Sequence, residues 1–123
     1  DMMILVVDDH PINRRLLADQ LGSLGYQCVT ANDGVDALNV LSKQHIYIVL
    51  SDVNMPNMDG IGFLQAVRSN PATKKAAFII LTAQGDRALV QKAAQLGANN
   101  VLAKPFTIDK MRAAIEAVFG SLK

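Results

Sequence analysis

The chain has 123 residues, half of them hydrophobic, and this size and composition fit one compact domain covering residues 1–123. Its 12 basic and 11 acidic side chains nearly cancel, so no strong field favours binding to nucleic acid or to an anionic membrane. The single cysteine, Cys28, excludes an internal disulfide, and without an apolar run of about 18 residues or a signal peptide pattern we expect a cytoplasmic protein.

Short apolar runs rich in valine and isoleucine alternate along the chain with longer segments whose apolar residues recur at helical spacing. A strand at 3–7 precedes a helix at 11–24, in which Pro11 fits the first turn and which Gly25 ends. There follow, in chain order, a strand at 27–30, a helix at 35–41, a strand at 47–51 and a helix at 61–67. The last elements are a strand at 77–81, a helix at 89–96 ended by Gly97, a strand at 100–103 and a helix at 108–119 ended by Gly120.

This alternation predicts an α/β fold in which crossover helices connect the strands of a parallel sheet. Five such units in a chain of this length favour an open, doubly wound sheet with helices on both faces. A closed barrel would need eight units and about 250 residues. In open sheets of this kind, ligands bind beyond the carboxyl ends of the strands. The residues that follow each strand are therefore the first candidates for a functional site.

Polar side chains follow four of the five predicted strands at their carboxyl ends. They are Asp8 and Asp9, Asp52, Thr82 and Lys104. Each of them alone has an ordinary explanation as a helix cap, a turn residue or a solvated lysine. Together on one rim, three carboxylates, a hydroxyl and an ammonium group indicate a site for a metal ion and a phosphoryl group. Oxygen ligands of this kind suit Mg²⁺.

The segments VVDDH, SDVNMPNMDG, ILTA and AKPF carry these residues, in this order along the chain. As a set they resemble the receiver domain of two-component response regulators, and the resemblance covers nearly the whole chain. It implies a flavodoxin-like (βα)5 fold with strand order 2-1-3-4-5. It also implies a phosphoprotein in a signal transduction phosphorelay, which is not an enzyme beyond catalysing its own phosphorylation and dephosphorylation.

By this resemblance, Mg²⁺ is the cofactor of the site. Asp8 and Asp9 match the acidic pair that helps to hold the metal, and Asn54 matches the position whose backbone carbonyl ligates it. Asp52 matches the aspartate that accepts the phosphoryl group and also contacts the metal. A carboxylate is a poor nucleophile toward a phosphate dianion unless a cation neutralises the developing charge, which the metal can do.

The same resemblance assigns Thr82 and Lys104 to the phosphoryl group. Thr82 matches the hydroxyl that meets this group, and Lys104 matches the lysine that precedes a usually cis proline, here Pro105. Neither His10 nor His45 lies in a helical context like that of a phosphodonor histidine, so both are expected at the surface or in caps. The donor is then a separate histidine kinase or histidine phosphotransfer protein. The output target is expected to be a protein that binds the fourth helix, the fifth strand and the fifth helix.

Val101 departs from the family pattern, in which many members have an aromatic residue at this position that rotates inward on activation. Valine is too short and too stiff at χ1 for that movement. We therefore expect phosphorylation to change the loop after Thr82 and the start of the fourth helix, and to change the fifth strand little. The first half of the chain resembles receivers of hybrid sensor kinases, and AAQLGANNVLAKPF resembles free-standing chemotaxis regulators. A free-standing regulator, a hybrid-kinase receiver and a mosaic of the two all stay open.

Three other functions compete with this one. A phosphatase of the haloacid dehalogenase type also uses an aspartate at a strand end, but it needs a second aspartate where this chain has Asn54. A flavodoxin-like FMN protein shares the fold, but the segment DDHPIN places two carboxylates where the cofactor phosphate needs hydrogen-bond donors. The third is a phosphorylation-independent interaction domain that keeps the site residues, and the sequence does not exclude it.

Overall fold

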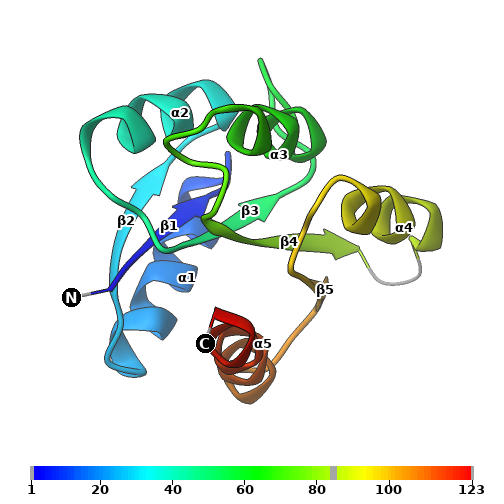
Figure 1. The fold of residues 1–123 in the computed structure, drawn as a ribbon. Coiled ribbons are helices and arrows are strands. Elements are labelled where there is room, and N and C mark those ends of the chain that lie inside the picture. The colour runs from blue at the N-terminus through cyan, green and yellow to red at the C-terminus, as the bar shows by residue number, and fades with distance from the viewer. Residues whose placement is uncertain (1, 84–85, 123) are drawn as a thin grey trace.

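Five parallel strands form one sheet at the centre of the computed structural model, which describes residues 2–83 and 86–122 (Figure 1). The strands are β1 (Met3–Val7), β2 (Gln27–Ala31), β3 (Ile48–Asp52), β4 (Ala77–Ala83) and β5 (Asn100–Lys104). Their order across the sheet is β2-β1-β3-β4-β5, and the four neighbouring pairs are all parallel. The predicted doubly wound fold and its strand order are confirmed.

Helices cover both faces of this sheet. Within the described residues they are α1 (Pro11–Ser23), α2 (Gly34–Lys43), α3 (Gly60–Ser69), α4 (Arg87–Gln95) and α5 (Ile108–Leu122). α1 and α5 lie on one face, and α2, α3 and α4 lie on the other (Figure 1). Successive strand side chains point to opposite faces, so Ile4 and Val6 of β1 enter one core while Leu5 and Val7 enter the other. No helix in the described part of the chain is long and apolar enough to cross a membrane.

β2, β3, β4 and β5 extend one or two residues beyond the ends predicted from the apolar pattern, and the added residues include three of the predicted site, Asp52, Thr82 and Lys104. Asp52 pairs with Leu81 in the ladder between β3 and β4, and Thr82 pairs with Ala103 in the ladder between β4 and β5. A backbone ladder continues wherever a neighbouring strand is in register, whatever the polarity of the side chain. The sheet itself therefore holds these site residues.

Two of the three predicted helix ends are confirmed. Gly25 and Gly97 follow α1 and α4, and their φ angles of 90° and 100° lie in the left-handed region that favours glycine. The prediction that Gly120 ends the fifth helix was wrong, because α5 continues to Leu122. A glycine inside a helix costs only about 1 kcal/mol. Burial of the apolar side of α5, which includes the fully buried Met111, outweighs that cost.

Arg68 of α3 connects the segments that precede β4 and β5. Its guanidinium donates hydrogen bonds of 2.6 to 3.1 Å to the backbone carbonyls of Lys74, Ala76 and Gly97. It also donates a bond of 2.9 Å to the side chain of Asn99. One side chain thus ties two connections to α3, so Arg68 is placed to stabilise the fold at the end of the sheet where β4 and β5 begin.

Arg68→Ala is expected to lower the free energy of unfolding by about 2 to 4 kcal/mol, because hydrogen bonds from charged donors contribute about 1.5 to 3 kcal/mol each and are not additive. Urea unfolding measures this change. Arg112→Ala is the matched control, since the ion pairs of Arg112 with Asp109 and Glu116 are exposed and should contribute about 1 kcal/mol or less. Equal losses in the two variants would contradict the stabilising role of Arg68.

Candidate functional site

The carboxyl ends of β1, β3, β4 and β5 bring the predicted site residues to one edge of the sheet. Asp8 follows β1 directly, Asp52 and Lys104 are the last residues of β3 and β5, and Thr82 lies near the end of β4. Asp52, Thr82 and Lys104 line one pocket of about 480 Å³, together with Asn54. Residues far apart in the sequence are therefore brought together, as the strand-end argument predicts.

Three carboxylates, those of Asp8, Asp9 and Asp52, form an acidic cluster at this edge. One oxygen from each lies within 4.8 Å of the others. Asp8 is completely buried, and its Oδ1 accepts a hydrogen bond of 2.9 Å from the backbone N–H of His10. Asp8 Oδ2 and Asp9 Oδ1 are buried without a hydrogen-bond partner among the described residues. Buried polar atoms rarely lack a partner, so the acidic cluster has the character of a cation site.

The electrostatic environment of Asp8 also favours a bound cation. Burial raises the pKa of the Asp8 carboxyl above its ordinary value, and the negative charges of Asp52 and Asp9 add to the rise. The hydrogen bond from the His10 N–H and the positive charge of Lys104 offset part of it. The ionised form of Asp8 is therefore destabilised in the protein, and a bound cation would relieve this.

The donor set fits a hard divalent cation. Mg²⁺ takes carboxylate and carbonyl oxygens, and it keeps several waters when only one or two carboxylates bind it directly. The acidic cluster offers three carboxylates close to one another, and Asn54 lines the adjoining pocket. The arrangement can hold a divalent cation next to the carboxylate of Asp52.

Lys104 pairs with Asp52 in the pocket. Its Nζ lies 3.1 Å from Asp52 Oδ1, which also accepts a hydrogen bond of 2.8 Å from the backbone N–H of Val53. The peptide bond between Lys104 and Pro105 is cis, as the resemblance implies. Thr82, only 4% exposed, lines the same pocket. A carboxylate with an ammonium group on one side and a cation site on the other can accept a phosphoryl group, because both positive charges neutralise its oxygens.

Two residues near this edge were not predicted from the sequence. Arg14 Nη1 donates a hydrogen bond of 2.8 Å to the backbone carbonyl of Asp8, and Asn13 lines the pocket that contains Asp52. His10 is exposed at the N-cap position of α1, in agreement with its expected surface or cap role. The first turn of α1 starts where β1 ends, so its residues necessarily lie near the carboxyl edge of the sheet. That position is the signal that could have identified Arg14 and Asn13.

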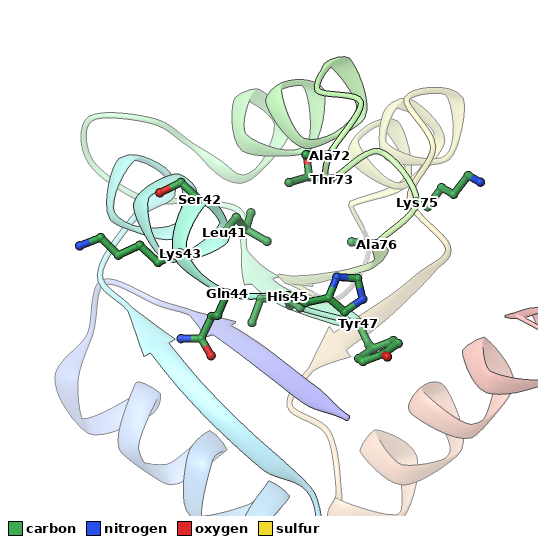
Figure 2. Close-up of a pocket in the computed structure, with 11 residues that line it drawn as sticks. Leu41, Ser42, Lys43, Gln44, His45, Tyr47, Ala72, Thr73, Lys75 and Ala76 are labelled. Carbon is green, nitrogen blue, oxygen red and sulfur yellow. The ribbon is translucent and has the colours of Figure 1, made fainter. Parts of the chain in front are cut away.

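A second pocket, of about 490 Å³, lies at the opposite end of the sheet, where β3 and β4 begin (Figure 2). Its lining includes His45 and Tyr47, whose rings meet edge to face with their centroids 4.5 Å apart. Lys43 and Lys75 also line it, but Figure 2 shows their side chains pointing away from the pocket. None of the predicted site residues belongs to this lining.

The segment that we expect to respond to phosphorylation starts beside the site. Asp86 lines the site pocket and caps α4, where its side chain accepts a hydrogen bond of 3.2 Å from the backbone N–H of Leu89. Gln84 and Gly85, which belong to the loop after Thr82, lie outside the described residues. Val101 is half-buried and packs against the core on the α4 side of the sheet.

A family model and the relatives of this chain all indicate the same protein family. A family model described as "Response regulator receiver domain" matches residues 4–116. A protein of Rhizobium etli named "Probable chemotaxis protein CheY" is 68% identical over 121 residues, which cover 98% of this chain and 94% of that protein. "Sensor histidine kinase RcsC" of Escherichia coli is 61% identical over 112 residues, which cover 91% of this chain but 12% of that protein.

A solved structure supports the same family. The receiver domain of the sensor histidine kinase PA1611 from Pseudomonas aeruginosa has a TM-score of 0.88 and 28% identity to this chain. The match covers 97% of this chain and 98% of the other, which has a magnesium ion coordinated in its active site cleft. Receiver domains are signalling domains and not enzymes in the usual sense, which sets aside the phosphatase and the flavodoxin alternatives. The matched residues and the identities to these relatives show that the chain belongs to the response regulator receiver domain family of two-component signalling.

Proposed function

We propose that this chain is a phosphoacceptor domain in which Mg²⁺-dependent phosphorylation of Asp52 switches a protein-interaction surface. The observation that carries this proposal is the position of the Asp52 carboxylate. It belongs to the acidic cluster and also lies 3.1 Å from the ammonium group of Lys104. Few structural roles require a buried strand to end on a carboxylate with this combination of neighbours.

The acidic cluster is the proposed metal site. Asp9, Asp52 and the backbone carbonyl of Asn54 would hold Mg²⁺ directly, and Asp8 would act partly through water. The buried and unpartnered oxygens of Asp8 and Asp9 support this assignment. When bound, Mg²⁺ supplies positive charge next to the oxygens of the transferred phosphoryl group.

Phosphoryl transfer then requires little from the protein beyond positioning. An oxygen of Asp52 bonds to the phosphorus of a phosphohistidine while the P–N bond breaks, and the histidine nitrogen leaves with the bonding electrons and takes up a proton. Lys104 is placed to donate a charge-assisted hydrogen bond to the phosphoryl oxygens in place of its contact with Asp52. Thr82 supplies a hydroxyl donor from the wall of the same pocket.

The donor is proposed to be a histidine kinase or a histidine phosphotransfer protein in the cytoplasm. Exposed apolar side chains next to the site suit a protein donor, since large exposed apolar residues often mark interaction surfaces. Ile12 and Leu16 of α1 are 83% and 54% exposed. A shallow pocket of about 280 Å³ separates Leu16 from Pro105 and Phe106 after β5. Relatives include both a chemotaxis protein and a longer sensor kinase, so a free-standing regulator and a part of a hybrid kinase are both compatible with this role.

The output is proposed to be a protein that binds the surface formed by α4, β5 and α5. Asp86 lines the site pocket and also caps α4. A phosphoryl group on Asp52 would therefore lie in the same pocket as a residue that belongs to the start of this surface. Because Val101 replaces the usual aromatic residue, we propose that the response is concentrated at the start of α4.

Incubation with a small phosphodonor such as acetyl phosphate is expected to add one phosphoryl group to the wild-type chain only when Mg²⁺ is present. Intact-mass spectrometry measures the adduct. Asp52→Asn should abolish it, and Asp109→Asn, which removes an exposed carboxylate from α5, should keep it. An equal adduct on Asp52→Asn would contradict the choice of phosphoacceptor. A wild-type chain that gains no adduct would favour the phosphorylation-independent interaction domain.

A further inference from the structure

The loop between β3 and α3, residues 53–59, is connected to the start of α2 by a hydrogen bond between two side chains. Asn57 Nδ2 donates a hydrogen bond of 2.7 Å to Asp33 Oδ2. Asp33 Oδ1 accepts a second bond, of 2.9 Å, from the backbone N–H of Asp36 and thereby caps α2. Asp33 is only 8% exposed, whereas Asn57 is exposed, so the bond lies at the surface and is partly buried. A single carboxylate thus serves a helix with one oxygen and the loop with the other.

The backbone of Asn57 is in a conformation that few residues adopt. Its φ is 68°, in the left-handed region where asparagine is tolerated better than other residues with a Cβ. The bond to Asp33 holds this conformation in place. The bond is made to the ionised form of the Asp33 carboxyl, which its hydrogen bonds favour. The hydrogen bonds from the Asp36 N–H and then from the Asn57 amide lower the pKa of the Asp33 carboxyl.

Further contacts fix the rest of the loop. The backbone N–H of Gly60 donates a bond of 2.8 Å to the carbonyl of Val53, which closes the loop at its base. Met58 packs on the start of α2 so closely that a Cβ on Gly34 would lie 2.8 Å from Met58 Cγ. Asn54 lies between the closed base and the residue that Asp33 holds. The segment that contains Asn54 is therefore held at both of its ends, by the Val53 carbonyl and by Asn57.

We propose that Asp33 and Asn57 are positioning residues for the divalent-cation site, an inference that rests on the proposed function. They hold the loop so that the carbonyl of Asn54 stays within reach of a cation bound by Asp9 and Asp52. Mg²⁺ demands near-ideal octahedral geometry, so a ligand on a loose loop binds it poorly. Removing groups that orient metal ligands weakens metal binding by about tenfold or more.

Three substitutions can separate the positioning of the loop from two other roles of these residues, the capping of α2 by Asp33 and the left-handed backbone conformation of residue 57. Asp33→Ser keeps an N-cap residue for α2 but removes the acceptor for Asn57. Asn57→Gly keeps the left-handed backbone but removes the amide donor. Asp36→Ser is the matched control. It removes the same charge from the same helix end, where Asp36 Oδ2 accepts a bond from the Asn32 N–H, and it leaves Asn57 bound to Asp33.

Titration of backbone amide chemical shifts with MgCl₂ tests the inference on the purified chain. Asp33→Ser and Asn57→Gly should each raise the Mg²⁺ dissociation constant about tenfold, and the double variant should match either one. Asp36→Ser should stay within about twofold of wild type. Without Mg²⁺, amide exchange in the loop should be faster in the two single variants than in the control.

The outcomes distinguish the two proposals. If the wild type binds no Mg²⁺, the proposed function fails and the positioning role fails with it. If the wild type binds Mg²⁺ and Asp33→Ser and Asn57→Gly bind it equally well, only the positioning role is overturned. The same conclusion follows if Asp36→Ser weakens Mg²⁺ binding as much as Asp33→Ser, because loss of charge or of helix stability would then explain the effect.

Discussion

Asp8→Asn is expected to stabilise the metal-free protein and to remove most of the stabilisation that Mg²⁺ gives to the wild type. Asp8 is completely buried, and its Oδ2 has no hydrogen-bond partner among the described residues. An asparagine keeps the oxygen that accepts the His10 N–H and removes the charge that burial and Asp52 penalise. Burying an uncompensated charge costs more than burying a neutral amide, so the metal-free variant should gain about 1 to 3 kcal/mol of stability.

Thermal unfolding with chelator and with millimolar Mg²⁺ measures both effects. A ligand that binds only the folded state raises its stability by mass action, so the wild type should melt at a higher temperature with Mg²⁺. Asp109→Asn, in which an exposed carboxylate is lost, should respond to Mg²⁺ as the wild type does. A full Mg²⁺ response in Asp8→Asn would show that Asp8 does not contribute to a metal site.

The difference in stability between Asp8→Asn and the wild type should depend on pH in a defined direction. The pKa of Asp8 is raised in the folded protein, so its protonated form favours folding and this contribution is lost as pH rises through the folded pKa. In chelator, the advantage of Asp8→Asn over wild type should therefore be largest at neutral pH. It should shrink as the pH is lowered through the pKa of folded Asp8 toward that of an ordinary carboxyl group. An advantage that grows with acid would contradict this explanation.

Gly60→Ala is expected to destabilise the protein by at least about 2 kcal/mol, because the added Cβ would collide with backbone. It would overlap the carbonyl oxygen of Asp52 and lie 2.9 Å from Val53 Cα. Neither atom can move without shifting the end of β3 and the loop that follows it. Because Asp52 is the proposed phosphoacceptor, phosphorylation should slow in the same variant. Urea unfolding and the rate of adduct formation measure the two effects.

Gly22→Ala is the matched control for this prediction. Gly22 is exposed in α1, and no described atom beyond its own helical surroundings lies within 4 Å of the position that an alanine Cβ would take. Alanine loses less backbone entropy than glycine in a helix, so this variant should gain up to about 1 kcal/mol. If both substitutions changed stability in the same direction and by the same amount, the close approach of Gly60 to Asp52 would not be the cause.

Much of the fold followed from local spacing. Alternating segments of strand and helix periodicity predicted the doubly wound sheet, and the structure places α1 and α5 on one face and α2, α3 and α4 on the other. Asp8, Asp52, Thr82 and Lys104 were predicted at one edge because each follows or ends a strand, and parallel strands share one carboxyl edge. The spacing of apolar residues is less informative about where each strand or helix ends. It missed the last residues of β2, β3, β4 and β5 and the continuation of α5 past Gly120.

The sequence by itself determined which elements form, their connections and the edge of the sheet at which the polar groups meet, because these depend on residue type and spacing along the chain. Only the tertiary structure decided which atoms touch there. The partnerless oxygens of Asp8 and Asp9, the bond from Asn57 to Asp33 across 24 positions and the pairing of Lys104 with Asp52 all depend on strand register and packing. A hydrogen bond needs its two atoms within a few tenths of an ångström of the right separation. Such accuracy arises only after distant segments have packed together.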